Sequence, residues 1–260
     1  MPTGDNAVRR LQVGTLRLEI HPSREAAGQA AARAAAASLC ELAGRASSFG
    51  VIFATGASQL ATLHALTETP GLPWNQVIGF HMDEYVGIAP DHPASFRRYL
   101  RENLTERAPL GAFHGIDGTK PDLESVAEDY VRLLRGHDPQ LCLLGIGENG
   151  HLAFNDPAEA DFADPRDMKL VRLDAQCRQQ QVAEGWFPTV DAVPDRALTL
   201  TIPALLRVPR LIASVPGPRK AHIVKRTLEE PISTACPATI FRTHPDVTVY
   251  LDRDSAAELD

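Results

Sequence analysis

Residues 51–81 read VIFATGASQLATLHALTETPGLPWNQVIGFH, and this stretch decides the fold. An apolar run from Val51 to Ala54 precedes a helical pattern from Gln59 to Thr67, and a second apolar run extends from Val77 to His81. Short apolar runs that alternate with helical patterns are typical of βαβ units. We therefore predict a strand, a helix and a second strand in that order.

The alternation continues on both sides of this unit. The further elements that we expect are strands at 16–20, 140–145, 197–201, 211–214 and 247–251, and helices at 25–43, 95–103, 123–135, after 174 and at 218–228. No internal repeat or Gly/Ser linker divides the chain. The sequence therefore predicts one α/β domain over residues 1–260, which is Rossmann-like, with a mostly parallel sheet, helices on both faces and an active site outside the carboxyl ends of the strands.

Composition narrows the class of protein. A chain of 260 residues that is 44% hydrophobic and 23% charged can bury a full core. The net charge of -7 argues against nucleic acid as a partner, because phosphate contacts need clustered Lys and Arg and no basic block is present. The four cysteines form no C-x-x-C pair, which is typical of thiols in a reducing cytosol. Residues 1–10 are expected to be disordered and lack the apolar core of a signal peptide, and no apolar span is long enough to cross a membrane, so we expect a soluble cytoplasmic protein.

The loop GIGENGHLAFNDP, residues 145–157, follows an apolar run and combines glycines with an imidazole and a carboxylate. Glycines let the backbone approach a ligand closely. His151 can exchange protons near neutral pH if Asp156 or another carboxylate orients its ring. The alternative is an ordinary strand-to-loop turn that carries a surface histidine.

The same loop contains a G-x-G-x-x-G pattern at Gly145, Gly147 and Gly150, as dinucleotide-binding proteins do. A dinucleotide fingerprint opens directly into a helix, whereas Pro157 disfavours helix at Asp156. It also normally lies near the start of its domain, and about half of this chain precedes it. We therefore reject a nicotinamide cofactor.

Two regions favour a bound phosphate. Thr55-Gly56-Ala57-Ser58 lies between a predicted strand and a predicted helix, where backbone amides and two hydroxyls suit an anion. The alternative is that Ser58 is merely the N-cap of the helix. Lys220 begins another predicted helix and opposes its dipole, so an anion would compensate it. Arg178 could be a second cation for that anion, although singly either residue fits a solvated surface.

A carboxylate pair follows the predicted strand at 77–81. Asp83 and Glu84 stand beside His81, and a carboxylate in a partly dry cleft can act as a general base. A solvated acidic turn is one alternative. Another is a metal site of His81, Asp83 and His151, but no close-spaced ligand set supports it, and we expect no metal.

Three motifs occur in order along the chain: Met82-Asp83-Glu84-Tyr85-Val86-Gly87, His92-Pro93-x-Ser95 and Gly150-His151-x-Ala153-Phe154-Asn155. Together they resemble the signatures of the glucosamine-6-phosphate deaminase and isomerase family, within the wider group that includes 6-phosphogluconolactonases. The resemblance spans about residues 51–251. It favours the deaminase branch, because lactonases typically have an acidic-arginine pair where Asp83-Glu84-Tyr85 stands.

The resemblance implies specific roles. Asp83 would move a proton between C2 and C1 of an open-chain amino sugar, and His151 would assist opening of the pyranose ring. A ketose imine would then be hydrolysed to ammonia and fructose 6-phosphate, without a metal or redox cofactor. The substrate-binding residues implied are Thr55, Gly56, Ala57, Ser58, Glu84, Arg178 and Lys220. Members of the family are monomers or hexamers, so a homo-oligomer stays open.

Three features depart from the family pattern. Asn149 stands where many members carry Asp, and Asp156 stands where they carry Glu; we count both among the catalytic residues around His151. Moving a carboxylate by about an ångström can cost on the order of a hundredfold in rate. Residues 158–188 look unlike the common lid, and we expect them to form a variable lid-like segment.

The departures leave alternatives to deamination of glucosamine 6-phosphate. One is the same chemistry on another 6-phosphosugar. A second is hydrolysis of 6-phosphogluconolactone, in which His151 would activate water. A third, ranked last, is a non-catalytic sugar-phosphate sensor, for which the sequence supplies no DNA-binding appendage.

Overall fold

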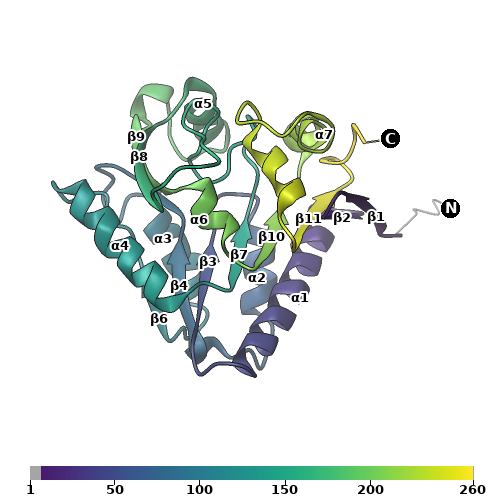
Figure 1. Ribbon diagram of the computed structural model, residues 1–260, viewed down its shortest axis with the longest axis horizontal. Helices are drawn as coiled ribbons and strands as arrows, with labels where there is room; N and C mark the ends of the chain where they lie inside the picture. Colours follow the sequence, from purple (N-terminus) through teal and green to yellow (C-terminus); the bar gives the residue numbers. More distant parts are fainter. Residues whose placement is uncertain (1–6, 260) are drawn as a thin grey trace.

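An eight-stranded sheet forms the centre of the computed structural model, which describes residues 7–259 (Figure 1). Its strand order is β1-β2-β11-β10-β7-β3-β4-β6, and only the β1–β2 pair is antiparallel. The strands are β1 (Arg9–Val13), β2 (Leu16–His21), β3 (Phe49–Phe53), β4 (Val77–His81), β6 (Ala112–His114), β7 (Leu141–Leu144), β10 (Arg210–Ser214) and β11 (Val247–Asp252). The prediction of a mostly parallel sheet in a single α/β domain is confirmed.

Helices cover both faces of the sheet, as predicted, because successive strand residues point to opposite sides. In β3, Ile52 joins one apolar cluster, whereas Val51 and Phe53 join another. The first cluster includes side chains of α4 (Leu123–His137), α6 (Ile202–Leu206) and α7 (Ala221–Glu229), and the second those of α1 (Arg24–Ala43), α2 (Leu60–Thr67) and α3 (Phe96–Leu100). Short 3-10 or π-helical segments are η1 (Trp74–Gln76), η2 (Arg101–Thr105), η3 (Val190–Ala192), η4 (Pro218–Lys220) and η5 (Pro237–Thr243).

A second, three-stranded antiparallel sheet corrects one expectation. The predicted strand 197–201 does exist as β9 (Arg196–Leu200), but it pairs with β5 (Asp83–Tyr85) and β8 (Met168–Arg172) instead of joining the large sheet. The pairing partner of a short apolar run is not encoded in its own residues, so the sequence pattern missed it. Figure 1 shows β8, β9 and α5 (Ala175–Ala183) at the upper left of the molecule and α7 at the upper right. Residues 158–188, expected to form a lid-like segment, contain β8 and α5.

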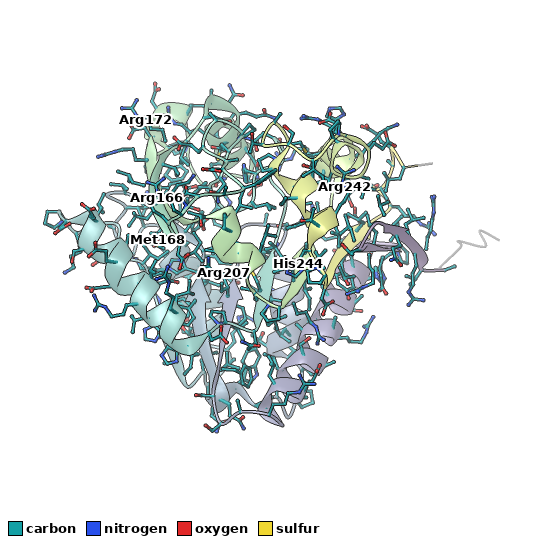
Figure 2. The ribbon with its side chains drawn as sticks, viewed as in Figure 1. Arg166, Met168, Arg172, Arg207, Arg242 and His244 are labelled. Atoms are coloured by element: carbon teal, nitrogen blue, oxygen red, sulfur yellow. The ribbon has the colours of Figure 1, made fainter. Side chains whose placement is uncertain are left out.

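Asp167 ties this small sheet to the helices of the large one. It is buried just before β8, and its carboxylate forms ion pairs with Arg135 of α4 (2.6 Å) and with Arg207, which follows α6. Figure 2 shows Arg207 below Met168 of β8. A buried carboxylate held by two guanidinium groups fixes the direction in which β8 starts.

Two observations bear on the expectations that residues 1–10 are disordered and that the chain does not cross a membrane. Residues 1–6, within the stretch expected to be disordered, lie outside the described residues, but Arg9 and Arg10 contradict that expectation because they pair with β2. Across residues 7–259, no helix is long and apolar enough to cross a membrane.

His81, at the end of β4, is a structural residue. Its Nε2 accepts a hydrogen bond from the backbone N–H of Ile116 (2.7 Å), and its backbone N–H and C=O both bond to the Tyr130 hydroxyl. Complete burial, with a smaller contribution from the charge of Arg97, lowers the pKa of His81 from 6.5 to about 3. His81 therefore stays neutral in the fold and does not line the cleft described below.

This burial predicts an acid-sensitive stability. The unfolded chain binds a proton at His81 below about pH 6.5 but the folded chain only below about pH 3, so the free energy of unfolding falls as the pH falls through this window. Urea unfolding at several pH values between about 4 and 8 should show a shallower pH dependence in His81→Asn than in the wild type. Exposed His222, changed to Asn, is the control and should leave the slope unaltered. An unchanged slope in His81→Asn would contradict the assignment.

Candidate active site

One cleft of about 590 Å³, partly open to solvent, lies where the loops after β3, β4, β7 and β10 meet. Because parallel strands end at the same edge of a sheet, loops far apart in sequence converge there. The predicted site residues that line the cleft are Thr55, Gly56, Ser58, Asp83, His151 and Lys220. The expected convergence of four loops is confirmed.

The His151 ring lies directly over the backbone of Gly147. A Cβ at position 147 would be 2.1 Å from Nε2 of the ring, far inside van der Waals contact. Position 147 must therefore be glycine, because any side chain there would collide with the His151 ring. This packing explains Gly147 without the dinucleotide-binding role that the G-x-G-x-x-G pattern would give it. Residues 145–160 contain no helix, consistent with rejecting that pattern.

A buried carboxylate array orients His151. Nδ1 of His151 lies 2.9 Å from Oδ1 of Asp156, outside ideal hydrogen-bond geometry, while the backbone N–H of His151 donates to Oδ1 of Asn149. The Asn149 amide donates to Asp156 (2.9 Å) and also to Asp174 (3.0 Å). Burial alone would raise the pKa of Asp156, but hydrogen bonding and charge from His151, then the Asn149 bond, hold it below its usual value. Asn149 thus separates two carboxylates that would otherwise repel.

Asp83 is the buried acid of the cleft. It begins β5 opposite Thr199 of β9, and its side chain is 6% exposed. Burial, followed by the neighbouring charge of Glu84, raises the pKa of Asp83 well above the usual value. A carboxylate with a raised pKa is a stronger base once it has lost its proton, which suits proton abstraction.

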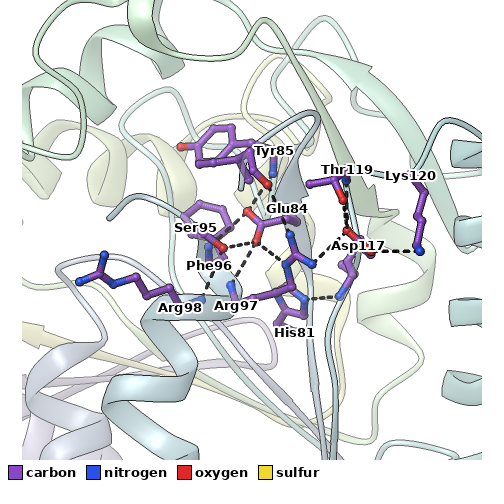
Figure 3. Close-up of polar contacts among 12 residues, drawn as sticks. His81, Glu84, Tyr85, Ser95, Phe96, Arg97, Arg98, Asp117, Thr119 and Lys120 are labelled. Atoms are coloured by element: carbon purple, nitrogen blue, oxygen red, sulfur yellow. Dashed lines mark hydrogen bonds and ion pairs between the residues drawn. The ribbon is translucent and has the colours of Figure 1, made fainter. Parts of the chain in front are cut away.

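Glu84 is not part of the cleft, contrary to the expectation that it binds substrate. Its side chain is fully buried and points to the start of α3 (Figure 3). Its two oxygens accept hydrogen bonds from the backbone N–H groups of Tyr85, Phe96 and Arg97 and from the Ser95 hydroxyl. Adjacent strand residues point to opposite sides, so Asp83 and Glu84 cannot both face the cleft.

The Thr55–Ser58 loop leads into α2 without a side-chain cap. The N-cap is Gln59, not Ser58, and its side chain makes no capping hydrogen bond. Instead its amide donates to the backbone oxygens of Leu144 and Ser214, at the ends of β7 and β10. Ala57 does not line the cleft, but the loop presents Thr55, Gly56 and Ser58 to it.

The two predicted cations have different environments. Lys220 lines the cleft, is 8% exposed, and has its pKa lowered by burial against the raising influence of Glu184 and Glu148. Arg178 faces away, because its guanidinium donates to the backbone oxygens of Val190 (2.5 Å) and Val193 (3.1 Å). The expectation that Arg178 contacts a ligand in this cleft is therefore wrong.

The metal site considered from sequence, with His81, Asp83 and His151, is not assembled, since His81 bonds to Ile116 away from the cleft. The described residues do bring His151, Asp156 and Cys177 within 4.8 Å of one another. Burial raises the pKa of the Cys177 thiol well above its usual value, which disfavours the thiolate that a metal needs. This cluster does not fit a metal centre.

Sequence reasoning missed the contribution of α5. Gln180 and Gln181 of this helix and Glu184, the residue after it, line the cleft, and Asp174, the N-cap of the helix, accepts a hydrogen bond from Asn149. Asp174 carried a signal, because Asp before a helical run is a typical N-cap. Nothing in the pattern of α5 indicated which of its faces meets the cleft.

The chain belongs to the family of glucosamine-6-phosphate isomerases and 6-phosphogluconolactonases, whose family model matches residues 22–250. It is 31% identical over 206 residues to a glucosamine-6-phosphate deaminase of Streptococcus thermophilus, covering 79% of this chain and 86% of that protein. A glucosamine-6-phosphate deaminase of a Geobacillus species is 34% identical over 210 residues, covering 78% and 81%.

Solved structures share the fold. A monomeric glucosamine-6-phosphate deaminase, described as a missing link of the NagB superfamily, superposes with a TM-score of 0.84 at 30% identity, covering 93% of this chain and 99% of that one. A 6-phosphogluconolactonase from Thermotoga maritima superposes with a TM-score of 0.71 at 21% identity, covering 91% and 98%. The second likeness concerns the fold alone.

The contact between Gly147 and His151 can be tested directly. Gly147→Ala should displace the imidazole and destabilise the protein by about 1–3 kcal/mol, the usual cost of overpacking. The His151 ring signals in 15N-histidine NMR spectra should shift. Gly136→Ala is the matched control, because a Cβ there meets nothing within 4 Å. Unmoved His151 signals in Gly147→Ala would contradict the packing described.

The Asn149 bridge predicts a compensating pair of substitutions. Asn149→Asp should place a third carboxylate beside Asp156 and Asp174 and lower the free energy of unfolding by about 1–3 kcal/mol. Adding Asp174→Asn should restore most of that loss, because Asn also caps α5 and supplies the missing donor. Urea unfolding of both single variants and the double variant measures the coupling. Additive losses would mean that the two positions do not share a hydrogen bond.

Proposed function

We propose that this protein converts glucosamine 6-phosphate into fructose 6-phosphate and ammonia by isomerisation of the open-chain amino sugar followed by hydrolysis. The observation that carries the proposal is the convergence of Asp83, the His151–Asp156 pair and Lys220 on one cleft. Relatives at 30–34% identity that are named glucosamine-6-phosphate deaminases support it.

Asp83 is the proposed general base. A C–H bond beside an aldehyde is only weakly acidic, so its removal needs a positioned base of raised pKa. Asp83 takes the proton from C2 and returns it to C1, while the C1 oxygen gains a proton and the C2 ammonium loses one, which converts the aldose amine into a ketose imine. Water then adds to C2, ammonia leaves, and the ketose remains.

His151 is the proposed acid–base group for opening the pyranose ring, where a proton leaves the C1 hydroxyl and one reaches the ring oxygen. Oδ1 of Asp156 lies 2.9 Å from Nδ1 of the imidazole, and Oδ1 of Asn149 accepts a hydrogen bond from the backbone N–H of His151. Both act as positioning residues. The Asn149 amide, which donates to both Asp156 and Asp174, supports the proposal that the shorter Asp156 can still position His151.

The far end of the cleft is the proposed site for the terminal oxygens of the sugar phosphate. Thr55, Gly56 and Ser58 bring backbone and hydroxyl groups to the uncapped start of α2, and Lys220 adds a buried ammonium. Ala57 belongs to the same loop but does not line the cleft. Binding at this end orients the reacting carbons toward Asp83.

We also propose a cytoplasmic setting. Cys40, Cys142, Cys177 and Cys236 are all free thiols, which is typical of a reducing compartment.

Asp83→Asn provides the test. The wild type is expected to release ammonia and fructose 6-phosphate from glucosamine 6-phosphate without added metal. Asp83→Asn should lose about 10²–10⁴-fold in kcat, the usual contribution of a positioned base, while still binding the sugar phosphate. Exposed Asp129→Asn is the control and should keep full activity. A coupled ammonia assay measures the rate, and calorimetry measures binding.

Galactosamine 6-phosphate and 6-phosphogluconolactone belong in the same assay. Lactone hydrolysis without ammonia from either amino sugar would assign the protein to the lactonase branch. Tight binding without turnover of any of them would indicate a sensor. Full activity of Asp83→Asn would remove the role proposed for this residue.

A further inference from the structure

Glu184, the residue after the last turn of α5, places a carboxylate in the part of the cleft proposed for the terminal oxygens of the substrate. It lines the same cleft as Lys220 and the Thr55–Ser58 loop. Its Oε2 lies 3.9 Å from the point where a Cβ on Gly56 would be. A ligand seated against this loop therefore meets Glu184 closely.

The carboxylate is held in this position. Oε1 accepts a hydrogen bond from Nε2 of Gln180 (2.7 Å), and Oε2 accepts one from the indole N–H of Trp186 (3.2 Å). Gln180 is itself held in place, because its Oε1 accepts a hydrogen bond from the backbone N–H of Glu148 in the loop at 145–157. A carboxylate oxygen has two lone pairs, so each oxygen keeps one for a ligand.

The charge around Glu184 is close to balanced. Among the described residues that line the cleft, Lys220 is the one lysine or arginine, and it forms no ion pair with Glu184 within 4.0 Å. Arg219 pairs with Glu148, and Arg178 faces the 190–193 turn. A dianionic phosphate at this end would therefore face one cation and one fixed anion.

A group that both accepts and donates a hydrogen bond fits this arrangement better. Its lone pair can accept from the Lys220 ammonium, and its proton can be donated to Glu184. A fully ionised phosphate has no proton to donate and is repelled by the carboxylate. Tyr85 of β5 and Tyr99 of α3 are further titratable side chains in electrostatic contact with Glu184, and burial raises the pKa of both, so they stay neutral.

We propose that Glu184 is a specificity-determining residue, which makes the distal end of the cleft select a ligand oxygen that carries a proton. This inference rests on the proposed function for the chemistry at the Asp83 end and for the placement of the substrate's terminal oxygens beside Lys220 and the Thr55–Ser58 loop. The O–H donor has two sources: the hydroxyl of an unphosphorylated amino sugar, or the P–OH of a singly ionised phosphate, which predominates below about pH 6.

The test compares the wild type with Glu184→Gln, using inorganic phosphate as a binding probe at about pH 5.5 and about pH 8. Removing the charge should tighten binding of phosphate at the higher pH by about fivefold to tenfold, and much less at the lower pH. Glu184→Asp, which keeps the charge, should not gain this affinity. Exposed Glu128→Gln on α4 matches the charge change away from the cleft and should bind as the wild type does. Thermal unfolding of each variant verifies folding.

Turnover of glucosamine and glucosamine 6-phosphate then separates the two sources. A wild type that prefers glucosamine at about pH 8, with this preference reversed in Glu184→Gln, identifies the sugar hydroxyl. A KM for glucosamine 6-phosphate that rises with pH in the wild type but not in Glu184→Gln identifies the singly ionised phosphate.

Equal phosphate affinity in the wild type and Glu184→Gln, or no measurable binding by either, would overturn the inference. Ammonia release from no amino sugar, with the difference in phosphate binding intact, would overturn the proposed function and leave the inference standing. The two failures are therefore distinguishable.

Discussion

Parallel pairing of the strands from β2 to β6 is the constraint on which the cleft depends. Neighbouring parallel strands leave the sheet at the same edge, so the loops after β3, β4, β7 and β10 must meet there, although their residues are far apart in sequence. Burial on both faces maintains this geometry, because consecutive residues of β3 anchor helices on opposite sides. The side chains that line the cleft are thus positioned by backbone pairing more than by contacts with one another.

Three buried acids near the cleft, Glu84, Asp156 and Asp83, lie in three different environments. Glu84 is surrounded by backbone donors and serves as a structural anchor for α3. Asp156 is stabilised as a carboxylate by its imidazole and amide neighbours. Burial raises the pKa of Glu84 in spite of these donors, and it raises the pKa of Asp83, which no hydrogen bond offsets, well above the usual value. Environment, and not residue type, therefore separates a structural carboxylate from one available for proton transfer.

The fold could be predicted from the sequence because apolar runs and helical patterns reflect burial on two faces of the sheet. The cleft could be predicted because polar loops follow the strands that end beside it. Side-chain direction could not be predicted from the sequence. Glu84 and Arg178 are polar, close to the cleft in sequence and plausible as ligand contacts, yet their hydrogen-bond partners lie elsewhere. Glu184 gave no signal at all, because its position depends on how α5 packs over the loop at 55–58.

The shared space of Gly147 and His151 also restricts the order in which this loop can evolve. A side chain at 147 and the imidazole in its present position exclude each other, so replacements at 147 become accessible only after the ring has been lost or moved. Loss of the ring first, by contrast, leaves a vacant volume that 147 can then fill. Losing the arrangement of Gly147 and His151 is consequently easier in evolution than regaining it. Engineered libraries must vary positions 147 and 151 jointly.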